Sequence, residues 1–195
     1  MESATGKALL LSSISRYFKQ NPGYITIFRE ILNGKSSISL RLIDWLVTHY
    51  AKTNDIHYWI DDQTNTIYKK IPSNTNIASR SRKFNLYTDY RAQLKSFNKI
   101  HFDPFRRHER INFIINDECT IETTVGQLNF FKWFFKNNVQ DFIKINITDL
   151  MKDMSDNYKS SKNSKGVKDN QSKQPVQNKK YSNTIKTEKS IVRFD

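Results

Sequence analysis

The sequence contains very little cysteine or glycine and has no long apolar run. Its single cysteine, Cys119, permits neither a disulfide within the chain nor a cysteine-based zinc site. The five glycines are scattered, so no glycine-rich loop is available to bind phosphate. The apolar run at 8–11 is too short for a signal peptide, and no stretch approaches the roughly 18 residues of a membrane span. We therefore expect a soluble intracellular protein without membrane contact.

Aromatic side chains, in contrast, are abundant. The chain of 195 residues contains thirteen Phe, nine Tyr and three Trp. Side chains of this size bury large areas, and the chain is long enough for one hydrophobic core. The apolar spacing predicts a single α+β domain over residues 7–154. It lies between a flexible N-terminus at 1–6 and a disordered basic tail at 155–195, where apolar residues are sparse.

Within the domain, the pattern predicts an N-terminal helical segment, two β-hairpins and a central aromatic-rich helix. Helical spacing is found in residues 7–20, 24–32, 36–52, 87–100 and 124–143, with a short turn at 148–154. Ser36 or Ser37 is expected to cap the third helix, and Thr124 the fifth. Alternation predicts hairpins from 56–60 with 66–71 and from 110–116 with 119–123. Residues 72–81, rich in Ser and Asn, are expected to form a loop.

The predicted helix over 124–143 is apolar on almost every side. Only Asn129, Lys132 and Lys136 form a polar stripe along it. A helix of this kind is either central to its own core or docked onto a partner. We expect burial in its own core, with an exposed part as the alternative.

Positive charge is distributed unevenly along the chain. The formal net charge is +13, yet the body outside two segments is close to neutral. Residues 69–110 hold eleven Lys and Arg against three Asp and Glu, and residues 155–195 hold ten against four. This asymmetry points to a polyanionic partner, with ordinary solubility charge as the alternative.

Basic residues near aromatic ones are the candidate nucleic-acid-binding residues. They are Lys69, Lys70, Arg80, Arg82, Lys83, Arg106, Arg107 and Arg110. Near the candidates at positions 69–83, Tyr87 and Tyr90 could let the surface follow a nucleic-acid strand. Further along the chain, Pro104 would fix a turn that presents Arg106 and Arg107 to phosphate. The competing interpretation pairs these arginines with Asp103, Glu109 or Glu122.

The sequence offers no convincing catalytic or metal site. His101, Asp103 and His108 are close in sequence, but a loop histidine and a turn aspartate explain them more simply. Cys119 has no supporting group that would make it a nucleophile, and we interpret it as a structural thiol. We therefore expect no enzyme activity, no cofactor, no metal and no small-molecule ligand.

Three segments together resemble a known family. They are ISLRLIDWLVT at 38–48, FDPFRR at 102–107 and IETTVGQLNFFKW at 121–133. They are similar to an uncharacterised protein family of nucleocytoplasmic large DNA viruses, such as mimivirus relatives. The abundance of Asn, Lys and Ile also fits an AT-rich giant-virus genome. The resemblance covers about residues 20–150 and implies no catalytic residue, because the family has no known activity.

These observations favour a non-enzymatic viral protein that acts by binding. DNA or RNA is the expected partner, bound through the segment 69–110 and the basic tail. The alternative is a structural or assembly protein of the virion or viral factory that contacts other viral proteins. In either case the expected location is the host cytoplasm, with the viral factory or the virion as destinations.

Overall fold

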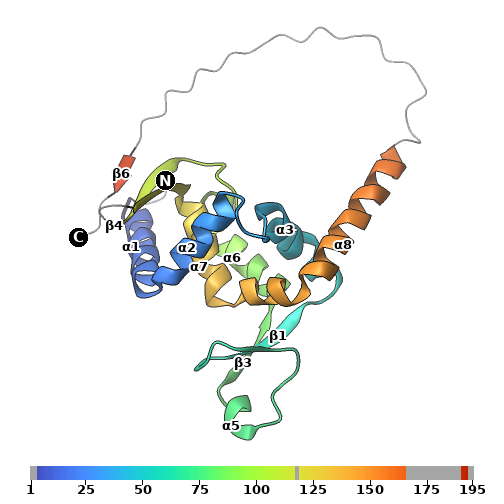
Figure 1. Ribbon diagram of the computed structural model, residues 1–195. Coiled ribbons are helices and arrows are strands. Elements are labelled where there is room, and N and C mark those ends of the chain that lie inside the picture. Colours follow the sequence, from blue (N-terminus) through green and yellow to red (C-terminus); the bar gives the residue numbers. More distant parts are fainter. Residues whose placement is uncertain (1–3, 117–118, 166–189, 193–195) are drawn as a thin grey trace, which may run out of the picture.

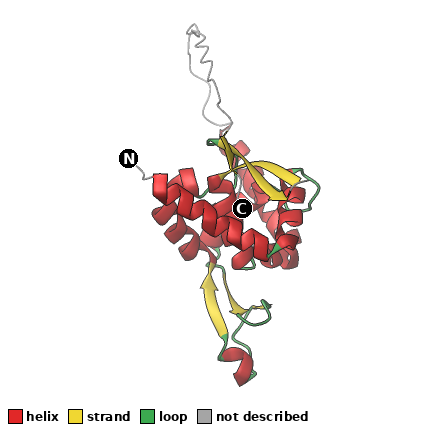
Figure 2. Ribbon diagram, turned by 90° about the vertical axis from the view of Figure 1, so that its left-hand side faces the viewer, coloured by secondary structure: helices red, strands yellow, loops and turns green. Residues whose placement is uncertain are grey.

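The computed structural model describes residues 4–116, 119–165 and 190–192 of the chain. It has a helical body with a small antiparallel sheet projecting at one end and a second small sheet at the opposite end (Figures 1 and 2). The predicted α+β class is therefore confirmed. None of the helices in the described part is long and apolar enough to cross a membrane.

The body is built mainly from helices. They are α1 (Ala4–Gln20), α2 (Pro22–Leu32), α3 (Leu40–Trp45), the π-helix η1 (Leu46–Tyr50), α4 (Ala51–Thr53), α6 (Leu86–His101), α7 (Val125–Lys136) and α8 (Val139–Lys165). The short helix α5 (Thr75–Ala78) lies outside the body, beside the projecting sheet (Figure 1). Thr124 caps α7 as predicted, because its hydroxyl accepts a hydrogen bond from the Gln127 N–H at 3.0 Å. The cap of α3 is Ser39, three residues before Leu42, rather than Ser36 or Ser37.

The strands form two separate three-stranded sheets. They are β1 (His57–Asp61), β2 (Ile67–Tyr68), β3 (Ser81–Asn85), β4 (Arg110–Asn116), β5 (Cys119–Thr124) and β6 (Ser190–Val192). The first sheet has the order β2-β1-β3 and is antiparallel throughout. We call this sheet and its connections, residues 57–85, the lobe. In the second sheet, β4 pairs antiparallel with β5 and parallel with β6.

Helix α7 lies at the centre of the core. Phe130, Phe131 and Phe134 are fully buried, so the interpretation of this helix as core is confirmed. The aromatic run does not continue as one helix to residue 143. Asn138 adopts a left-handed conformation (φ 52°), and the chain turns there from α7 into α8.

The segment expected to be a loop at 72–81 contains structure that the sequence pattern concealed. Helix α5 lies within it, capped by Asn74, and β3 begins at Ser81. Only Phe84 of β3 is buried, because the strand covers the body with one face and leaves the other polar. One buried apolar residue is too weak a periodic signal to indicate a strand.

The chain also differs from the expected boundaries at both ends. Helix α1 begins at Ala4, within the segment expected to be flexible. Helix α8 continues through the expected boundary at 155 to Lys165. In this extension the Arg41 guanidinium lies over the ring of Tyr158, 4.2 Å from its centroid. A packed helix can extend into polar sequence because propagation adds a hydrogen bond for each residue. Strand β6 also lies in the expected tail, whereas residues 166–189 and 193–195 lie outside the described part.

Candidate nucleic-acid interface

The eight candidate residues do not share one surface. Five belong to the lobe and three lie at or just before β4, and these two regions are at opposite ends of the body (Figure 1). The lobe group is Lys69, Lys70, Arg80, Arg82 and Lys83. The β4 group is Arg106, Arg107 and Arg110. A single continuous basic surface that includes all eight is therefore not formed.

The β4 group is engaged in local contacts. Arg107 forms a bidentate ion pair with the buried Asp103, with both N–O distances at 2.8 Å. Arg106 donates to the Glu122 carbonyl at 3.3 Å, and Arg110 donates to the Glu122 carboxylate at 2.5 Å. Asp103 also accepts the Phe105 N–H, which is the turn that the sequence predicted. The pairing interpretation thus describes the geometry of these arginines.

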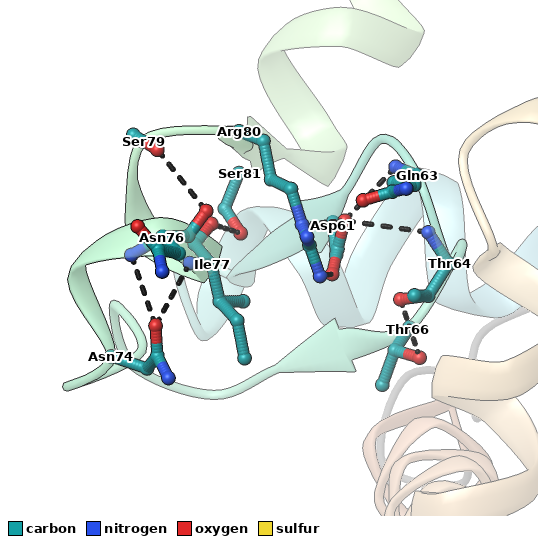
Figure 3. Close-up of polar contacts among 10 residues, drawn as sticks. All are labelled: Asp61, Gln63, Thr64, Thr66, Asn74, Asn76, Ile77, Ser79, Arg80 and Ser81. Atoms are coloured by element: carbon teal, nitrogen blue, oxygen red, sulfur yellow. Dashed lines mark hydrogen bonds and ion pairs between the residues drawn. The ribbon is translucent and has the colours of Figure 1, made fainter.

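Arg80 has a structural position at the far end of β1. Its guanidinium donates to both oxygens of Asp61 at 2.9 Å, and the Asp61 side chain is only 1% exposed (Figure 3). Asp61 also accepts the backbone N–H groups of Gln63 and Thr64, which fixes the turn after β1. The hydrogen bonds from Arg80 hold the pKa of Asp61 well below its ordinary range.

Arg80→Gln is expected to make the thermal stability change less as the pH falls from neutral to about 3. The lowered pKa of Asp61 contributes stability that is fully present above its unfolded value of about 4 and is lost as the pH falls below that. Without Arg80 the pKa rises towards that value. The variant should therefore melt below wild type at neutral pH, and the difference should narrow at about pH 3. Arg16→Gln, an exposed change on α1, is the control, and an equal difference at both pH values would contradict this role.

Arg82 and Lys83 are neighbours in β3 but face opposite sides of the sheet. Arg82 points to the body, where it donates to the Asn137 side chain at 3.1 Å, and it also pairs with Asp62 of the lobe at 3.0 Å. Lys83 is exposed on the outer side, and Lys69 and Lys70 are exposed just after β2. Within the described residues, none of these three lysines forms an ion pair.

The outer face of the lobe carries an aromatic row that sequence reasoning did not assemble. Trp59 of β1 is paired in register with Tyr68 of β2 on one side and with Lys83 of β3 on the other. Directly paired residues of antiparallel strands project from the same face. Trp59 and Tyr68 are both partly exposed, whereas Tyr58 and Ile60, on the other face of β1, are buried. We call Trp59, Tyr68 and Lys83 the outer row.

The aromatic residues that the sequence did suggest are placed differently. Tyr90 is 5% exposed and packs near Phe102 and Trp133, so it belongs to the core. Tyr87 is partly buried at the start of α6. The alternation of residues 56–60 already placed Trp59 opposite Tyr58, but the pairing with Lys83 depended on the unrecognised strand β3.

Other kinds of site receive little support in the described part of the chain. No group of three or more His, Cys, Asp and Glu side chains lies close enough there to hold a metal ion. His101 and His108 lie on either side of a turn whose carboxylate, Asp103, is occupied by Arg107.

Comparisons with known proteins place the chain among uncharacterised sequences. A family model described as a family of unknown function (DUF7197) matches residues 3–193. An uncharacterised protein of Acanthamoeba polyphaga mimivirus is 27% identical over 186 residues, covering 93% of this chain. The match covers 63% of that relative, so the chain spans less than two thirds of its length. No solved structure matches.

Proposed function

We propose that this chain, which belongs to an uncharacterised family with a giant-virus relative (DUF7197), binds single-stranded nucleic acid on the outer face of the lobe. The observation that carries the proposal is the outer row of Trp59, Tyr68 and Lys83. Aromatic side chains on an exposed sheet face can stack on successive bases, and neighbouring cations can contact the backbone phosphates.

The surroundings of the outer row support this proposal. Within the described residues, neither Trp59 nor Tyr68 makes a close ring contact with another aromatic side chain. Both side chains are partly exposed, so a base could reach part of each ring. Lys69 and Lys70 follow Tyr68 directly and are exposed. Arg80 lies beyond the other end of β1, next to Ser81, and its charge is compensated by Asp61. The lysines are thus the expected phosphate contacts.

Substitutions in the outer row test the proposal through binding of a short labelled oligonucleotide. Trp59→Ala should weaken binding roughly 5- to 150-fold, the range for removing one base–aromatic stack. Trp59→Phe should retain most of the affinity, because a ring remains. Lys83→Gln should reduce the log–log salt slope by about 0.7 for a single strand. Lys35→Gln, at an exposed lysine outside the lobe, should leave the slope unchanged.

Two results would overturn the proposal. One is a folded Trp59→Ala variant that binds oligonucleotide as tightly as wild type. The other is a wild-type affinity that does not respond to salt, because a phosphate-binding surface releases counterions on association. Thermal melts of the same samples establish that each variant is folded.

A structural or assembly role is the second candidate function. Its expected surface, an exposed part of α7, is weakened by the burial of that helix. Helix α8 carries exposed apolar side chains instead, with Ile145 61% and Met151 47% exposed, and its second half extends away from the body (Figure 1). These residues are the observation that favours a protein partner for α8.

A further inference from the structure

A cavity of about 430 Å³ lies between α6, α7 and the inner face of β3. Three cationic side chains line it: Arg82 from β3, and Lys132 and Lys136 from α7. One carboxylate, Asp89 of α6, also lines it, and this group accepts a hydrogen bond from the Trp133 indole at 2.6 Å. The charged side chains of the lining therefore have a net charge of +2. Asp89 keeps its charge while it accepts from the indole, and Arg82 is also paired with Asp62, outside the lining, at 3.0 Å, so the two lysines carry the uncompensated charge.

The two lysines are placed unfavourably for a cavity that contains only water. They are one helical turn apart, a spacing at which like charges destabilise a helix. Burial lowers the pKa of Lys132, and the charge of Lys136 lowers it further. The Lys132 ammonium donates to the Ser13 hydroxyl at 2.7 Å, and no carboxylate in the described part neutralises it. An anion in the cavity would relieve this repulsion.

The rest of the lining adds two aromatic side chains and an amide to the charged groups. Phe97 of α6 and Trp133 of α7 supply aromatic surface, and Trp133 is 6% exposed. The side chain of Gln93, one turn before Phe97 on the same face of α6, makes no hydrogen bond to the described residues. The cavity volume lies within the roughly 300–1,000 Å³ of small-ligand pockets, and its mainly polar and charged lining favours an anionic ligand.

We infer that this cavity binds a phosphate group, carried by inorganic phosphate or by a mononucleotide. Arg82, Lys132 and Lys136 contact the phosphate oxygens, since guanidinium and ammonium groups form strong charge-assisted hydrogen bonds to them. In a mononucleotide, the base packs against Phe97 and Trp133 beside the amide of Gln93. The site is distinct from the outer row, because Arg82 and Lys83 project from opposite faces of β3.

Calorimetric titration of the full chain at low ionic strength tests the inference with three probes: inorganic phosphate, adenosine monophosphate and adenosine. Lys136→Gln is the first variant, because Lys136 is exposed and its replacement spares the core. It should weaken binding of both phosphate-containing probes about tenfold, as expected for one charge-assisted hydrogen bond. Tighter binding of the mononucleotide than of phosphate identifies the aromatic wall as a base subsite, whereas equal binding identifies inorganic phosphate as the ligand.

Lys83→Gln is the matched control, because it removes one lysine charge from the other face of the sheet. It should leave phosphate binding unchanged, and Lys136→Gln should leave oligonucleotide binding unchanged, so the two proposed sites can fail independently. Arg82→Gln, in β3 rather than α7, is a second variant and should also weaken binding of both phosphate-containing probes. The inference is overturned if wild type binds neither phosphate-containing probe at millimolar concentration, or if Lys136→Gln and Arg82→Gln bind both as wild type does. Binding of adenosine as tight as that of the monophosphate would also overturn it.

Discussion

Trp133→Ala is expected to lower the free energy of unfolding by about 3–5 kcal/mol, the range for removing a large buried aromatic side chain. Trp133 is 6% exposed and lies among the rings of Phe102 at 5.5 Å and Phe130 at 5.4 Å between centroids. Its indole N–H also donates to Asp89 at 2.6 Å. The substitution removes the packing and leaves that acceptor without its donor. Chemical denaturation followed by circular dichroism measures the loss.

Trp133→Phe separates the two contributions. It retains a ring in the core but loses the hydrogen bond to Asp89, so it should cost about 1–3 kcal/mol. A Trp133→Ala variant that unfolds at the wild-type denaturant concentration would show that α7 does not pack as described. Loss of a bound protein without loss of stability would instead indicate that this side of α7 is an interface.

Gly126→Ala is expected to be the most damaging change for its size. Gly126 lies in the first turn of α7, where that helix meets the end of α6. An added Cβ would lie 2.6 Å from the Ile100 carbonyl oxygen and 3.3 Å from the Phe102 nitrogen. These are backbone atoms, so relief requires α6 and α7 to separate. A loss of about 1–3 kcal/mol or more is expected, as for overpacking in a tight core.

Gly23→Ala provides the matched control for this substitution. Gly23 lies in the first turn of α2, and an added Cβ would meet nothing within 4 Å. Alanine is favoured over glycine in helices by about 0.5–1 kcal/mol, so this variant should equal or exceed wild-type stability. If both alanine variants melt alike, close approach of α6 to α7 is not the reason for glycine at 126.

Elements with a strong periodic signal could be predicted from the sequence. The helix that begins after Thr124 is an example, because its cap and its apolar run both indicate the same start. The π-helix at Leu46–Tyr50 could not be predicted, since its apolar face is also compatible with a regular helix. Strand β3 could not be predicted either, because its pairing with β1 stabilises a segment with little apolar character.

The candidate sites show the same distinction between local and long-range information. The turn at Asp103 and the possible pairing of Arg107 depend on neighbours in sequence, and both were within reach of sequence reasoning. The cationic cavity joins Arg82 to Lys132, two residues that are fifty positions apart. Nothing in the local pattern relates them, because their proximity depends on how the lobe packs against α7.

The turn between α7 and α8 fixes the position of the lobe mechanically. The Tyr58 hydroxyl of β1 donates to the Asn137 carbonyl at 2.7 Å, and Arg82 of β3 donates to the Asn137 side chain. The Asn138 side chain donates to the Asn65 carbonyl, so the connection between β1 and β2 is tied to the same turn. The lobe is thus clamped to the body at three points. These hydrogen bonds restrain the lobe relative to the body, so a force applied to its outer face by the proposed nucleic-acid ligand would be transmitted to the end of α7.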